Sequence, residues 1–266
     1  MDVNQLLGYF GALCVGLILG LIGGGGSILT VPILVYLIGL NPVIATAYSL
    51  FVVGTTSLFG ALQNFRNKMV DIRAAIVFSI PAFAAIYLTR RYLVHAIPDS
   101  LFTIFGFEVT KNIFIMVFFA IVMFLAAMSM IKSKKKTRPE NQSESYNIPI
   151  IIIDGILIGV ITGIIGAGGG FLFVPALVIL AHIPIKKAIG TSLVIVSVNS
   201  LIGFLGDIQT LIIDWKFLLT FTAISIVGII IGVYTTKFIS GSKLKKGFGW
   251  FTIVMALYII FKELHK

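Results

Sequence analysis

The chain has 266 residues, of which 20 are Lys or Arg and 10 are Asp or Glu, so its formal net charge is +10. Hydrophobic residues make up 58% of the chain and charged residues only 11%, whereas about a quarter of the residues in a soluble domain are charged. This composition excludes a soluble enzyme and a nucleic-acid-binding protein, and it indicates an integral membrane protein. The single cysteine, Cys14, excludes a disulfide framework, a Cys-x-x-Cys redox pair and a thiolate metal cluster.

Apolar segments follow one another along the whole chain. The first has no positively charged start and no cleavage site, so we expect a retained helix rather than a signal peptide. Eight segments are long enough to cross a bilayer, and two are short enough to be broken or re-entrant helices. The long segments are 3–22, 43–64, 74–95, 109–131, 148–165, 186–206, 215–238 and 247–262, and the short ones are 28–40 and 171–181. We therefore predict an all-α polytopic membrane protein.

Residues 132–147 form a polar, basic stretch between the fifth and sixth segments, rich in Lys, Ser, Asn and Glu. Clustered Lys and Arg mark cytoplasmic loops, and placing this stretch inside puts most of the other Lys and Arg inside and the N-terminus outside. The other interpretation of the basic charge is a contact with anionic lipid or a partner. We predict a first transmembrane repeat over 1–131, a cytoplasmic linker over 132–147 and a second transmembrane repeat over 148–266.

The two halves repeat each other at a constant offset of 143 residues. Shared apolar composition does not explain the matched small and polar residues, which pair Gly23 with Gly166, Pro32 with Pro175, Ser49 with Ser192, Ser57 with Ser200 and Asp71 with Asp214. Each half holds five apolar segments, and this odd number makes the second half enter the membrane from the opposite side. We therefore predict two inverted-topology repeats, as in many secondary transporters.

A glycine cluster precedes the short helix of each half, at 23–26 before Ser27 and at 166–170, where Ala167 interrupts the glycines. Near-consecutive glycines end a helix, and the helix that follows presents unpaired N–H groups and the positive end of its dipole. Matched breaks of this kind predict an anion site where the two clusters meet near the membrane midplane. The alternative is close helix packing through small residues.

These motifs resemble the TauE/SafE family of sulfite and organosulfonate exporters, also called the TSUP family. The resemblance rests on a glycine run, a Val-Pro pair and an Ala-x-x-x-Ser-Leu segment in each half, at Val31-Pro32 and 45–50, and again at Val174-Pro175 and 188–193. It implies transport of sulfite, thiosulfate or organosulfonates in the export direction. Tyr48 stands where the second half has Thr191, so the two halves are not chemically equal.

Uncharged polar side chains follow the matched segments 43–64 and 186–206. Ser49 and Thr56 are seven residues apart and share a helix face, and Ser192 and Asn199 repeat this spacing. The alternative for each hydroxyl is a hydrogen bond to its own helix. We expect no deeply placed Arg or Lys, so that amides and hydroxyls would bind the anion. The predicted substrate-binding residues are Gly23, Gly24, Gly25, Gly26, Ser27, Ser49, Thr56, Gly166, Gly168, Gly169, Gly170, Thr191, Ser192 and Asn199.

Charged and titratable groups gather near the ends of the segments. Asp71 and Asp214 each precede a long segment and are predicted to cap its helix. His95 and His182 are expected to be satisfied residues at the membrane interface rather than proton relays, and Asp154 lies near the start of its segment.

The sequence has no P-loop, potassium filter, zinc-binding motif or hydrolase motif, so we predict no enzyme activity, no metal and no cofactor. The prediction is a secondary transporter in the cell membrane that moves a small sulfur oxyanion or sulfonate by alternating access. Its expected surroundings are the lipid bilayer and no nucleic acid, and a homo-oligomer is compatible with it. Two alternatives stay open, namely a passive anion channel and a non-transporting membrane subunit or scaffold.

Overall fold

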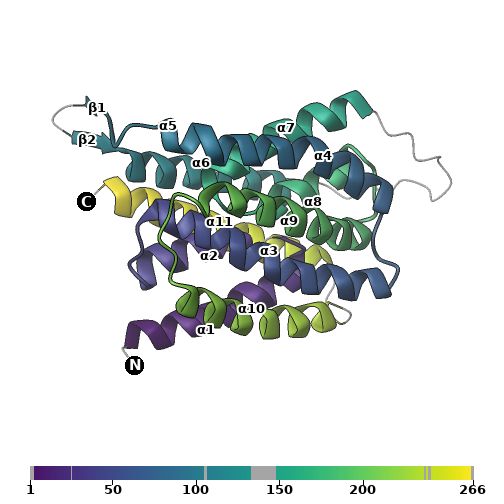
Figure 1. The fold of residues 1–266 in the computed structure, drawn as a ribbon. Coiled ribbons are helices and arrows are strands. Elements are labelled where there is room, and N and C mark those ends of the chain that lie inside the picture. Colours follow the sequence, from purple (N-terminus) through teal and green to yellow (C-terminus); the bar gives the residue numbers. More distant parts are fainter. Residues whose placement is uncertain are drawn as a thin grey trace.

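The computed structural model describes residues 3–24, 26–104, 107–132, 148–236, 238 and 241–264. Gly25 and nearly all of the predicted linker lie outside these residues. The described chain forms a bundle of helices that run roughly along one direction, with a short hairpin at the end of the bundle where both termini lie (Figure 1).

Every apolar segment expected from the sequence is helical. The first half contains α1 (Val3–Ile22), α2 (Ser27–Pro32), the π-helix η1 (Ile33–Leu37), α3 (Pro42–Arg66), α4 (Ile72–Leu88), the π-helix η2 (Thr89–Leu93), α5 (Val94–Ala96) and α6 (Lys111–Lys132). The second half contains α7 (Ile148–Ile165), α8 (Gly170–Ile179), α9 (Ile185–Asp207), α10 (Trp215–Thr235) and α11 (Gly241–Leu264). Among the described residues, five helices have the length and hydropathy of a membrane span. The eight full spans therefore stay a prediction.

One element was not expected. β1 (Ser100–Ile104) and β2 (Phe107–Thr110) form an antiparallel hairpin in which Thr103 pairs with Glu108. The hairpin joins α5 to α6 at one end of the bundle (Figure 1). Within the described residues it is the one element that is not helical.

The helix starts follow from local side-chain caps. Asp71 Oδ1 accepts a hydrogen bond from the N–H of Ala74 at 3.1 Å, and Asp214 Oδ1 accepts one from Phe217 at 3.1 Å. Both predicted caps are confirmed. At the start of α3, Asn41 caps the N–H of Val43 at 2.9 Å, and Pro42 occupies the first helical position, where its missing N–H costs no hydrogen bond.

The helices of the two halves pack against one another in matched pairs. α1 packs on α10 and α4 packs on α7, while α3 packs on α10 and α4 packs on α9. Because α1 corresponds to α7, α3 to α9 and α4 to α10 at the offset of 143, each of these contacts occurs twice with the halves exchanged. The central contact joins α3 directly to α9, and a further one joins α6 to α11.

Small residues bring these helices close together. A β-carbon on Gly16 of α1 would lie 1.9 Å from the carbonyl oxygen of Ser225, and one on Gly228 of α10 would lie 2.3 Å from that of Leu13. In the matched contact, a β-carbon on Gly159 of α7 would lie 2.6 Å from the carbonyl oxygen of Ala82. These glycines serve close packing, as small-residue motifs do in membranes.

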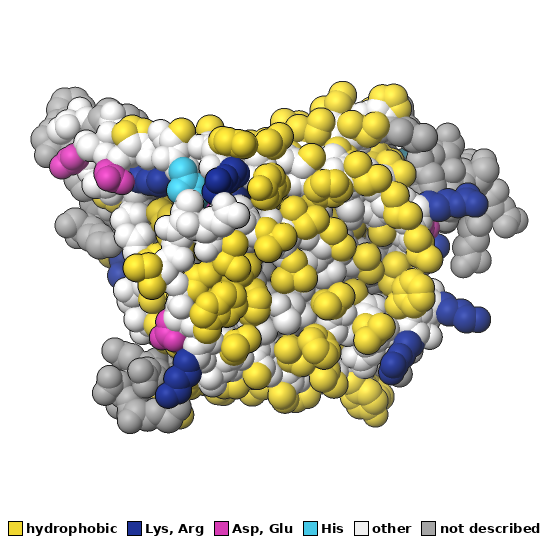
Figure 2. Space-filling model, viewed as in Figure 1, with side chains coloured by type: hydrophobic (Ala, Val, Ile, Leu, Met, Phe, Trp, Pro, Cys, Tyr) yellow, Lys and Arg dark blue, Asp and Glu magenta, His cyan; other side chains and the backbone are white. Residues whose placement is uncertain are grey.

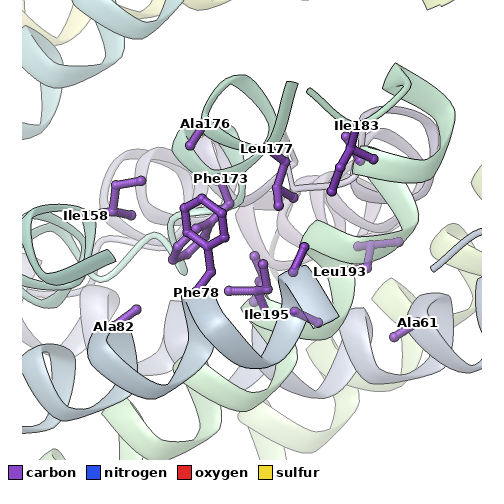
Figure 3. Close-up of a cluster of buried hydrophobic side chains, with 14 of the residues drawn as sticks. Ala61, Phe78, Ala82, Ile158, Phe173, Ala176, Leu177, Ile183, Leu193 and Ile195 are labelled. Atoms are coloured by element: carbon purple, nitrogen blue, oxygen red, sulfur yellow. The ribbon is translucent and has the colours of Figure 1, made fainter. Parts of the chain in front are cut away.

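Apolar side chains form both the interior and the outer surface. Phe78 of α4 and Phe173 of α8 meet edge to face with ring centroids 6.4 Å apart, beside Leu177 and Ile195 (Figure 3). On the surface, apolar side chains cover the middle of the bundle and charged ones lie toward its two ends (Figure 2). This distribution matches a protein whose middle faces lipid.

Candidate functional site

The two glycine turns lie against each other in the interior. A β-carbon on Gly24 would lie 2.3 Å from the Cα of Gly170, and one on Gly170 would lie 2.2 Å from the Cα of Gly24. Only residues without a side chain permit this approach. The structure thus brings together the two breaks that the sequence placed 143 residues apart.

Each turn also contacts the long central helix of the other half. Gly23 and Gly166 both have φ near 69°, and their β-carbons would lie 2.7 Å from the Cα of Ile189 and of Thr46, respectively. The left-handed backbone and the close neighbour both require glycine here. Since Thr46 and Ile189 correspond at the same offset, the two contacts are one arrangement made twice.

Buried polar side chains lie on α3 and α9, the two helices of the central contact. Ser49, Thr56 and Ser57 of α3 and Asn199 and Ser200 of α9 are fully buried. Within the described residues, their side-chain oxygen and nitrogen atoms have no hydrogen-bond partner. Buried polar groups are nearly always paired, because an unpaired one costs about 1–3 kcal/mol. Within the described residues, this row therefore leaves hydrogen-bond donors and acceptors unused on both helices. We call these five residues the polar stripe.

The second glycine turn borders this stripe directly. A β-carbon on Gly168 would lie 2.6 Å from Ser200 Oγ and 2.8 Å from Val53 Cγ1. The predicted residues Ser49, Thr56 and Asn199 lie in the stripe, and the structure adds Ser57 and Ser200. The sequence already paired Ser57 with Ser200 across the halves, but their helical position differs from that of Ser49 and Thr56. The polar stripe includes both the pair Ser49 and Thr56 and the pair Ser57 and Ser200.

Three other predicted residues hold the turns and helix ends in this conformation. Ser27 Oγ donates to the carbonyl oxygen of Gly24 at 2.5 Å, and Ser192 Oγ donates to the carbonyl oxygens of Gly23 and Ile189. Thr191 Oγ1 accepts from the N–H of Asp71 at 2.8 Å and donates to the carbonyl oxygen of Lys187. Contact of these three with a substrate stays a prediction.

Tyr48 and Thr191 make the same hydrogen bond although their side chains differ. Tyr48 Oη accepts from the N–H of Asp214 at 2.6 Å, as Thr191 accepts from Asp71. Both pairs are related by the offset of 143. Each ties the start of a central helix to the start of a long helix in the other half.

The expectation of no deeply placed Arg or Lys is wrong. Arg90 of η2 is fully buried, and its Nε donates to Asp207 Oδ2 at 2.6 Å. Its Nη1 donates to Thr46 Oγ1 and to the carbonyl oxygen of Gly163, both at 3.2 Å. The apolar pattern treated Arg90 as the membrane-surface end of a span, and no local signal linked it to Asp207, which is 117 residues away.

Other charged groups lie nearer the ends of the bundle. Lys187 Nζ lies 3.0 Å from Asp71 Oδ2, and the Lys187 side chain is one-third exposed. His95 is satisfied, as expected, by the carbonyl oxygen of Arg90 at 2.7 Å and by Thr210 Oγ1 at 2.9 Å. Within the described residues, no three His, Cys, Asp or Glu side chains gather as a metal site would require.

Comparison with known proteins gives one family and several relatives. Residues 9–259 match the family model described as sulfite exporter TauE/SafE. A probable membrane transporter protein of Xylella fastidiosa is 29% identical over 94% of this chain and 92% of its own length. The probable membrane transporter protein YunE of Bacillus subtilis is 28% identical over 78% of this chain and 79% of its own. No solved structure matches the chain.

Proposed function

The chain belongs to the sulfite exporter TauE/SafE family of membrane transporters, and on this basis we propose that it is a secondary transporter of small sulfur-containing anions. The substrate class is sulfite, thiosulfate or an organosulfonate, and the proposed direction is export. The substrate is held between the two glycine turns and the polar stripe, and it crosses by alternating access. The proposed location is the cell membrane, with the N-terminus outside and the linker in the cytoplasm.

The observation that carries this proposal is the polar stripe. Within the described residues, these five fully buried polar side chains have no partner, which is costly unless a polar ligand completes their hydrogen bonds. Hydroxyl and amide donors suit an oxyanion that must bind and leave again. α8 begins at Gly170, two residues after Gly168, which borders the stripe. The N-terminus of α8 adds the positive end of a helix dipole.

The exchanged helix contacts support inverted repeats and a rocking motion. α1 on α10 and α7 on α4 are the same contact with the halves exchanged, which is the pattern that two interlocked inverted repeats produce. The bonds from Tyr48 to Asp214 and from Thr191 to Asp71 then close the two ends of the bundle. Alternating access opens one of them while the other stays closed.

The test is uptake of labelled thiosulfate and sulfite into proteoliposomes that contain the purified protein. We expect saturable flux that unlabelled sulfite, thiosulfate and taurine inhibit. A non-saturating conductance would instead identify a passive anion channel. Folded protein without flux for any of these anions would leave a membrane subunit or scaffold as the remaining function.

A further inference from the structure

Arg90 and Asp207 form an ion pair in the interior that joins the two halves of the chain. Both side chains are 0% exposed, and the carboxylate Oδ2 contacts both Nε and Nη2 of the guanidinium. The pair links η2 of the first half to the last residue of α9 in the second half. Two charges removed from water in this way carry a large desolvation cost.

The pair is not saturated by the surrounding residues. Asp207 Oδ1 has no hydrogen-bond partner within the described residues, and Arg90 Nη2 has none beyond its ionic contact with Oδ2. The contacts from Nε and Nη2 to Asp207 Oδ2 and the two from Nη1 use four of the five N–H groups. Within the described residues, one Nη2 N–H and Asp207 Oδ1 are left without a partner, and the N–H groups that bind Asp207 become available only if the carboxylate is displaced.

The matched positions of the other half carry uncharged residues. At the offset of 143, Arg90 corresponds to Val233 and Asp207 to Asn64, both of which are buried. Val233 and Arg90 lie against the corresponding glycines, Gly20 and Gly163. The same structural position is therefore filled once by an apolar and an amide side chain and once by two charges.

The guanidinium also borders the proposed anion site. Its Nη1 bonds to Thr46 and to the carbonyl oxygen of Gly163, and Thr46 lies directly against Gly166 of the second glycine turn. Arg90 is thus the buried cation that reaches the turn where the proposed substrate is held. Guanidinium binds oxyanions through paired N–H donors.

We propose that Arg90 binds the transported anion and that Asp207 is its resting counter-ion, which the anion displaces and which then takes up one proton. This inference rests on the proposed function and deepens it by naming the coupled ion. The proton comes from water and binds one carboxylate oxygen, while the guanidinium keeps its charge, so no other bond changes. A displaced carboxylate without a partner stays neutral in a dry interior. Anion and proton therefore cross together, so net export requires an outward anion gradient that exceeds the inward proton gradient.

The other charges near the pair lie toward the hairpin end of the bundle. The exposed His95 of α5 acts on Asp207, Lys111 of α6 lies near both Arg90 and Asp99, and the backbone of Arg91 lies near Gly206. Because His95 acts on Asp207, the experiment includes a variant without this imidazole.

The experiment measures the KM for methanesulfonate and thiosulfate as a function of pH in proteoliposomes, because these anions keep their charge across the range used. Because one proton binds with each anion, the KM of the wild-type protein rises about tenfold per pH unit. This rise begins above the pKa that the Asp207 carboxyl has in the anion-free protein. An acidic outside also drives accumulation of the anion inside. His95→Gln keeps both properties.

Asp207→Asn imitates the protonated carboxyl and tests the coupling. We expect its KM to become independent of pH and its anion exchange to persist, while a proton gradient no longer drives accumulation. A pH profile and accumulation like those of the wild type would overturn the role of Asp207. If the single variant does not fold, the pH profile of the Arg90→Val/Asp207→Asn double variant, which leaves no charge buried alone, decides between the same outcomes.

The double variant Arg90→Val with Asp207→Asn copies the residues of the other half and tests the role of Arg90. We expect it to fold with a melting temperature close to that of the wild type, because no buried charge is left alone. Its flux falls about a hundredfold, since the anion has lost its cation. Flux and pH dependence equal to those of the wild type would show that the pair is only structural. A wild-type protein that moves none of these anions would refute the proposed function itself, which is a distinct result.

Discussion

Ser197 and Ser200 lie three residues apart on α9 and differ in whether the hydroxyl is hydrogen-bonded within the described residues. Both are buried, but Ser197 Oγ donates to the carbonyl oxygen of Val194 at 2.9 Å, whereas Ser200 Oγ has no partner within the described residues and lies beside Gly168. A hydroxyl that bonds to its own helix is occupied. One without a partner is available to a ligand.

Replacing Ser200 by Ala should lower transport without loss of stability. Within the described residues the buried hydroxyl has no hydrogen bond to lose, so its removal should not lower the free energy of unfolding. A lost hydrogen bond to an anion weakens binding about tenfold, which a KM measurement in proteoliposomes detects. Ser197→Ala is the matched control and keeps the wild-type KM. Equal KM values for the two variants would remove Ser200 from the site.

Alanine substitutions at Gly168 and Gly39 distinguish the effect of backbone strain from the effect of a blocked site. Both have positive φ, 66° and 80°, but a β-carbon on Gly168 would meet Ser200 Oγ at 2.6 Å, whereas one on Gly39 would meet nothing within 4 Å. Alanine at either position costs about 1 kcal/mol of backbone strain. We expect Gly39→Ala to transport normally. Gly168→Ala should abolish flux and melt at a somewhat lower temperature than Gly39→Ala while still folding, because its β-carbon must displace Ser200 Oγ and Val53. Active Gly168→Ala protein would contradict the placement of the site at the second turn.

At the scale of the elements, the α1–α10 crossing depends on glycines spaced four apart on both helices. Gly16 and Gly20 of α1 face Gly228 and Gly232 of α10, and each would place a β-carbon within 3 Å of the opposite backbone. Because lipid supplies no hydrophobic force between helices, this close packing is what holds the pair together. The glycines at 23–24 and 166–170 differ, because they end helices instead of joining them.

Leucine at position 228 should separate α10 from α1. The side chain would collide with the backbone at Leu13, so Gly228→Leu destabilises the protein by about 3 kcal/mol. A lower melting temperature in detergent reports this loss. Gly247→Leu on α11 serves as control, because a β-carbon there has no neighbour within 4 Å. Equal melting temperatures would show that the α1–α10 contact is loose.

At the scale of the whole molecule, the two ends of the bundle should face opposite sides of the membrane. Ser100 lies on the hairpin at the end where the chain termini also lie, and Asn67 lies at the other end, after α3 (Figure 1). Both are exposed, and the only native cysteine is Cys14. Orientation can therefore be read from single cysteines in a Cys14→Ser background.

We expect a membrane-impermeant maleimide added to intact cells to label Ser100→Cys and not Asn67→Cys. The reason is that the excess of Lys and Arg follows the end that carries Arg66, Lys68 and Arg73, and positive loops remain inside. Both cysteines should react after the cells are opened. Labelling of Asn67→Cys alone in intact cells would reverse the predicted orientation.

Local patterns in the sequence predict much of this architecture. The apolar segments, the glycine breaks at 23–24 and 166–170 and the caps at Asp71 and Asp214 depend on residues a few positions apart. Hydropathy, backbone freedom and hydrogen bonds within one turn act at that range. The offset of 143 added the correspondence of the halves. These signals therefore gave the helices, their breaks and most of the polar stripe.

Only the tertiary structure decided which groups meet across the halves. The ion pair of Arg90 with Asp207, the shared role of Tyr48 and Thr191, and the contact of Gly24 with Gly170 each join residues more than one hundred positions apart. No local pattern encodes such a contact, because it depends on the helices crossing at one place in space. A charge at the end of an apolar segment looks the same in sequence whether it faces water or, like Arg90, is buried beside a carboxylate.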